Sequence, residues 1–184
     1  MHLAAVQLIA NALADSTIGV NAVLDSIPRG DHRRPPNVQV YDETRVGWVS
    51  RLELAEEPPE GTALPGLVVV LGGPIGWQSK GRPTRDAPSQ TANQITVGLH
   101  YLTRETETEV GVTDAILTLR AARGVLNILA QPDFVALRTL YGVRLETLVE
   151  NQYARLFTPI EDVILAGSLL TTWTARETLP HYTP

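Results

Sequence analysis

Residues 95 to 109, "ITVGLHYLTRETETE", decide how the rest of the chain is interpreted. Ile95, Val97, Leu99 and Tyr101 occupy alternate positions, which predicts a strand with one buried face. The apolar alternation then stops, and three glutamates follow at alternate positions just before a helical pattern: Glu105, Glu107 and Glu109. The stretch therefore predicts a core strand that runs on through a strand-like acidic segment toward a helix.

The acidic run has two chemical interpretations. The simpler interpretation is a solvated strand end, because carboxylates before a helix complement the positive end of the helix dipole. A hard-cation site is the other, and it is disfavoured because three alternating carboxylates on one strand face repel one another unless solvent or a metal separates them. We therefore expect no metal here.

The helix that follows is predicted from "VTDAILTLRAARGVLNILAQ", residues 112 to 131. Thr113 or Asp114 is the expected N-cap, and Pro132 closes the helix. Apolar spacing near 3.6 residues predicts the inner edge of the helix. Its expected members are Ile116, Leu119, Arg123, Leu126 and Leu129, with Leu119 and Leu126 buried.

The other elements follow from the same periodicities. Leu3, Val6, Ala10 and Leu13 predict an N-terminal amphipathic helix, and a short helical segment follows between residues 19 and 26. Strands are predicted at 38–42, 45–54, 67–71 (buried on both faces) and 143–150, with a continuation past residue 151. A long strand ends the chain, with one shared face, Val163, Leu165, Leu169, Thr171 and Trp173, and a dent of small residues at 167–168.

Residues 72–94 separate "LVVVL" from "ITVGLHYL" and show no periodicity. We interpret them as a long hairpin loop between two antiparallel strands, because a connection of this length is uncommon and usually functional. The whole chain, 1–184, is expected to be one α+β domain. Its mostly antiparallel sheet is packed by the N-terminal helix and the central helix, with 72–94 as an extended loop.

Composition limits the function. The 184 residues are 43% hydrophobic, enough for one core, and the net charge of −5 argues against a general nucleic-acid binder. The chain has no cysteine, so thiolate metal sites and disulfides are excluded. The first residues lack the basic region of a signal peptide, and no apolar run approaches the ~20 residues of a membrane helix.

No pattern in the chain predicts catalysis, and we expect no catalytic residue, cofactor or metal. The four histidines are scattered, "GGPIGWQSKG" lacks the spacing of a phosphate-binding loop, and no nucleophile elbow occurs. His100 lies mid-strand and is expected to be a surface or cross-strand residue.

Two basic clusters are candidate contacts for a partner. Arg33 and Arg34 follow His32 in one loop. The long loop carries Trp77 and, after it, Lys80, Arg82 and Arg85. An aromatic ring among cations can stack on bases and bind phosphate, or it can contact an acidic protein. The acidic net charge favours the protein partner.

The order of elements resembles that of the tail terminator (tail-completion) proteins of long-tailed bacteriophages and related phage-derived tails. The likeness runs from the N-terminal helix through "LPGLVVV" at 64–70, the long hairpin loop, "ITVGLHYLTRE" and "DAILTLRAARGVLNIL" to the final strand pair. The resemblance implies a structural virion protein of the tail or neck, assembled in the host cytoplasm. It implies a hexameric ring that contacts the tail tube protein and the head-tail connector or stopper protein.

In such a ring, genomic DNA passes through the lumen without specific binding. A negative lumen would repel the phosphates, so Glu105, Glu107 and Glu109 would face the lumen or a neighbouring subunit. Other functions remain open: another neck or tail component (adaptor, stopper or tube protein), a small enzyme, or a single-strand nucleic-acid binder that uses Trp77.

Overall fold

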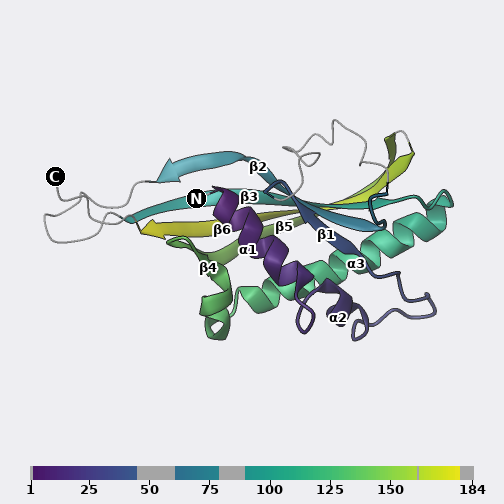
Figure 1. Cartoon of the computed structure of the whole chain (residues 1–184), viewed down its shortest axis with the longest axis horizontal. Coiled ribbons are helices and arrows are strands. Elements are labelled where there is room, and N and C mark those ends of the chain that lie inside the picture. The colour runs from purple at the N-terminus through teal and green to yellow at the C-terminus, as the bar shows by residue number, and fades with distance from the viewer. Residues whose placement is uncertain (1, 45–60, 79–89, 161, 179–184) are drawn as a thin grey trace, which may run out of the picture.

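The computed structural model describes residues 2–44, 61–78, 90–160 and 162–178 (Figure 1). One six-stranded sheet has the order β1-β2-β3-β6-β5-β4. Its strands are β1 (Gln39–Asp42), β2 (Gly66–Gln78), β3 (Gln90–Thr103), β4 (Thr139–Leu140), β5 (Val143–Ile160) and β6 (Val163–Thr178). The β1–β2 pair is parallel and every other pair is antiparallel. The predicted α+β class with a mostly antiparallel sheet is confirmed.

In the described residues, α1 (His2–Ala14) and the long α3 (Thr108–Leu129) cover one face of this sheet, and the short α2 (Val20–Leu24) packs against α3 (Figure 1). The short 3-10 helix η1 (Pro132–Arg138) leads from α3 into β4. Buried side chains of α1, α3 and the sheet form one continuous core. Within it the predicted Leu119 and Leu126 are 2% and 0% exposed.

β2 is buried on both faces, as its run of β-branched residues predicts. Leu67 and Val69 join the core under the helices, whereas Val68 and Val70 join a second cluster on the opposite face. All four side chains are at most 1% exposed. The predicted strand at 45–54 lies outside the described residues.

The prediction of a loop over residues 72–94 is wrong at both ends, where the structure has strand. β2 continues to Gln78 and β3 begins at Gln90, so Trp77 pairs with Asn93. Register shifts after Leu71 and after Ile75 break the alternation, which is why the pattern is not visible in the sequence. Gly72 is required at the first shift, since an added Cβ would lie 2.7 Å from Thr96 Cγ2.

A register shift also changes the inward face of β6. Leu169 and Trp173 lie in the core under the helices, but Val163 and Leu165 belong to the opposite cluster. The pairing moves between Tyr101–Gly167 and Leu102–Leu165, which places one extra residue in β6. The single face predicted for the whole strand is therefore wrong, and the dent of small residues is the site of the bulge.

Two predicted helix faces are corrected at individual residues. Leu3 is 60% exposed on α1, and Ile116 is 37% exposed on α3. Arg123 is exposed as well. A helix turns by about 100° per residue, so Ile116 and Arg123, seven residues apart, lie on one exposed stripe about 40–60° around the helix from the buried Leu119.

Candidate interaction surface

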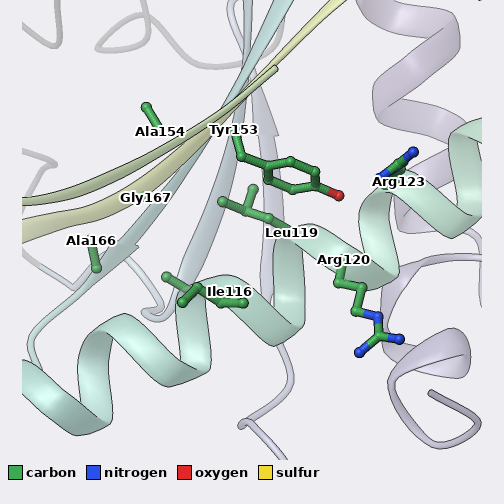
Figure 2. Close-up of a pocket in the computed structure, with 9 residues that line it drawn as sticks. Ile116, Leu119, Arg120, Arg123, Tyr153, Ala154, Ala166 and Gly167 are labelled. Atoms are coloured by element: carbon green, nitrogen blue, oxygen red, sulfur yellow. The ribbon is translucent and has the colours of Figure 1, made fainter. Parts of the chain in front are cut away.

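A groove lies between α3 and the β5–β6 hairpin. Its volume is about 310 Å³. Figure 2 shows Tyr153 of β5 lying over Leu119, with Arg120 and Arg123 at the same end of the groove. The remaining lining is small or apolar: Ala115, Ile116, Ala154, Ala166 and Gly167. An apolar floor with cations at one end suits an acidic protein segment better than a nucleic-acid base.

The two arginines of the groove retain binding capacity. The Arg123 guanidinium carbon lies 5.8 Å from the centre of the Tyr153 ring, a cation–π distance. Arg120 donates one long hydrogen bond, 3.4 Å, to the Pro28 carbonyl. Neither arginine forms a salt bridge with a carboxylate of the described residues. Burial raises the pKa of Tyr153, and the hydrogen bond from Arg123 opposes that rise.

The acidic segment is a helix start and not a strand. β3 ends at Thr103, Glu107 is the N-cap of α3, and Glu109 lies in its first turn. The helix thus begins before the predicted caps, Thr113 and Asp114. The cause is local, because successive side chains accept the free backbone N–H groups of the turn. The Glu105 N–H donates to Thr103 Oγ1 at 3.0 Å, and the Glu107 N–H donates to Glu105 Oε1 at 3.0 Å.

Glu107 and Glu109 are exposed, and Glu105 is half-buried. No salt bridge joins these three carboxylates to a cation of the described residues. Within those residues, no group of three or more metal-ligating side chains could hold an ion. The glutamates therefore complement the N-terminal end of α3 and leave negative charge at the surface.

The predicted basic loop at 32–34 packs against the protein's own helices. Arg33 Nη2 donates to Asp114 Oδ2 at 2.7 Å, and Arg34 Nε donates to Asp25 Oδ1 at 2.5 Å. Asp114 is only 3% exposed, so burial raises the pKa of its carboxyl group while Arg33 opposes the rise. The loop is thereby attached to the start of α3, and His32 borders the same helix face.

The second predicted cluster is only partly described. Trp77 lies near the end of β2, beside the strand that returns as β3. Lys80, Arg82 and Arg85 lie outside the described residues. Trp77 therefore belongs to the β2–β3 hairpin of the sheet, whereas Arg33 and Arg34 belong to the loop that packs on the helices.

His100 lies in the interior of the sheet. It is 6% exposed, and its Nδ1 lies 3.1 Å from Ser168 Oγ of the neighbouring strand. Its Nε2 is buried without a hydrogen-bond partner, and burial lowers its pKa. The cross-strand position is as expected, and the neutral imidazole bonds a hydroxyl with no carboxylate to orient it, unlike a hydrolytic triad.

Three contributors to this surface were not predicted from the sequence. Arg120 and Ile116 project outward from α3, and Tyr153 crosses from β5. Arg138 does not belong to this surface: it is buried, and its Nη1 donates to the carbonyls of Ala130, at the end of α3, and Glu146 of β5. The spacing of Ile116, Arg120 and Arg123 was a usable signal for an outer stripe.

Comparison with known proteins gives no family for this chain. No family model matches the sequence, and no curated protein is significantly similar to it. In the described residues, no helix has the length and hydrophobicity needed to cross a membrane.

Proposed function

We propose that this chain is a tail terminator subunit of a long-tailed phage or phage-derived tail. In this proposal it forms a hexameric ring that caps the tail tube and joins it to the head connector. DNA passes through the opening, and the chain has no catalytic role. The proposal rests on the resemblance in element order and on one structural observation, the open edges of the sheet.

The sheet has two long outer edges that carry no strand among the described residues. β1 pairs with β2 only at Gly66–Val69, so no strand of the described residues lies on the outer side of β2 from Val70 onward. β4 pairs with β5 only at Val143 and Arg144, and just beyond them Arg138 Nη1 donates to the Glu146 carbonyl. Past that contact, no strand of the described residues lies on the outer side of β5. These edges lie on opposite sides of the strand order.

Open edges on opposite sides support a head-to-tail assembly. Unpaired strands expose N–H and C=O groups that a neighbouring copy can satisfy. A contact between two different edges of identical subunits is heterologous, and it closes into a ring when the rotation between neighbours fits.

The charge of the chain fits a channel for DNA. The net charge is −5, and the exposed Glu107 with the half-buried Glu105 adds negative charge where β3 turns into α3. Like-charged walls keep phosphates from adhering during passage. Trp77 and the basic residues that follow it are assigned to contacts with the tail tube or the connector.

The experiment is microscopy of the purified protein, alone and added to tails that lack their terminator. Closed rings with a central opening, located at the head-proximal end of the tube, are expected. Rings along the whole tube would identify a tube protein. Binding only to the connector would identify an adaptor or stopper, and no binding to either would contradict a place in the neck.

A further inference from the structure

The exposed stripe of α3 has opposite charges at its two ends. Glu109, Val112, Ile116, Arg120 and Arg123 all lie within about 80° of one another around the helix, because successive residues turn by about 100°. None of the five is among the buried residues of α3. Negative charge is at the N-terminal end of the stripe, positive charge is at the other, and half-exposed Ile116 lies between them.

These charges cannot neutralise one another within one subunit. Glu109 and Arg123 are fourteen residues apart, which is about 21 Å at 1.5 Å per residue. Arg33, which lines one hollow with Glu109, donates a hydrogen bond to Asp114. The stripe therefore presents both a negative and a positive group to solvent.

The spacing makes the stripe complementary to itself. Ile116 is midway between Glu109 and Arg123, seven residues from each. A second copy turned by 180° about an axis at Ile116 runs its α3 antiparallel to the first. That rotation places each Glu109 opposite the partner's Arg123, Ile116 against Ile116, and the aliphatic part of Arg120 over Val112.

We propose that α3 is a two-fold docking surface and that its occupant is the α3 stripe of a second copy of this chain. The negative and positive ends lie on the same side of the helix. Two copies therefore meet through the same surface, which is an isologous contact. Antiparallel helix dipoles and two reciprocal ion pairs favour this arrangement. The contact is separate from the open sheet edges, so it does not rest on the proposed ring.

The absence of cysteine from the chain gives a direct test. In Ile116→Cys the new thiols of a two-fold pair meet at the axis, whereas in Asn127→Cys they are about 33 Å apart along the helix, 22 residues at 1.5 Å. Mild oxidation of Ile116→Cys should give a covalent dimer on a denaturing gel, and Asn127→Cys should stay monomeric. Equal cross-linking of both variants, or none in either, would overturn the proposal.

Charge reversal gives an independent readout. Arg123→Glu and Glu109→Arg should each lose self-association, here measured by at least a tenfold rise in the dimer Kd. An equimolar mixture should form a 1:1 dimer, because every facing pair then has opposite charges. Full self-association of either variant alone, or no dimer in the mixture, contradicts the geometry. The cross-linking gel and the mixing experiment both measure only the contact between two α3 helices. Their outcome therefore does not depend on whether rings form.

Discussion

Gly167 of β6 lies directly against Leu119 of α3. A Cβ added at Gly167 would stand 3.1 Å from Leu119 Cδ1 and 3.3 Å from Ala115 Cβ. The β6 bulge and the absence of a side chain there let the helix approach the sheet, and the same approach forms the floor of the groove under Tyr153. The position of α3 thus depends on one small residue.

Gly167→Ala should destabilise the fold by ~1–3 kcal/mol, since the extra methyl overpacks the helix–sheet contact. Gly124→Ala is the matched control, because its new Cβ would meet Val23 Cγ1 at an ordinary 3.5 Å. Alanine in a helix interior is favoured over glycine by ~0.5–1 kcal/mol, so the control should be stabilised. Urea unfolding measures both, and equal effects would show that the close contact carries no strain.

Leu126→Ala should lower the free energy of unfolding by ~2–5 kcal/mol, because it removes a fully buried side chain from the main core. Leu3→Ala makes the same chemical change at a residue that is 60% exposed on α1 and should stay within ~0.5 kcal/mol of wild type. Similar losses in the two variants would mean that the core is not arranged as described.

His100 should make stability depend on pH below neutrality. Burial lowers its pKa in the folded protein, so the unfolded chain binds the proton more readily. Stability is therefore full above the unfolded pKa of ~6.5 and declines as the pH falls below it. One such group contributes at most ~1.4 kcal/mol per pH unit.

The comparison for this effect is His100→Gln, which keeps a polar side chain and removes the titration. Unfolding curves between pH 7.5 and 5.5 should show the wild type losing more stability than the variant. All other groups are the same in both proteins, so their contributions cancel. Parallel pH profiles would show that protonation of His100 is not resisted by the fold.

Residues 79–89, which connect β2 to β3, should be dispensable for folding but not for joining tails. Replacing residues 79–89 by a short Gly-Ser turn leaves the described strand pairs, including Gln78–Ala92, in place. We expect an unchanged thermal transition and a failure to complete tails, because the basic residues beyond Trp77 are assigned to a partner. If the shortened protein joined heads and tails normally, residues 79–89 would have no role in the function.

The core of the fold was predictable because burial imposes periodicity. The alternation at 95–101 and the helical spacing of Leu119 and Leu126 both match the structure. Prediction failed where the backbone departs from a regular period, at the β2 register shifts and at the β6 bulge. The early start of α3 was missed because no N-cap side chain marks it. Instead, the Glu105 carboxylate accepts the Glu107 backbone N–H just before the helix.

The interaction surface was less predictable than the core. Arg123 and Ile116 were assigned inward because an apolar spacing near 3.6 residues fits two adjacent stripes of one helix. From the sequence, Arg33 and Arg34 were expected to be free to contact a partner. In the structure Arg33 is hydrogen bonded to Asp114, far along the chain, and Arg34 to Asp25, nine residues before it. Such pairings depend on tertiary geometry, which charge counts do not contain.

The ring is the central claim, and the mass of the assembly together with its image tests it most directly. The purified chain, at rising concentration and with tail tubes present, should give a closed assembly with six-fold symmetry and a central opening wide enough for duplex DNA. Electron microscopy with mass measurement on the same sample provides both quantities. Monomers, two-fold dimers or open filaments, with no closed ring even on the tail tube, would contradict the account.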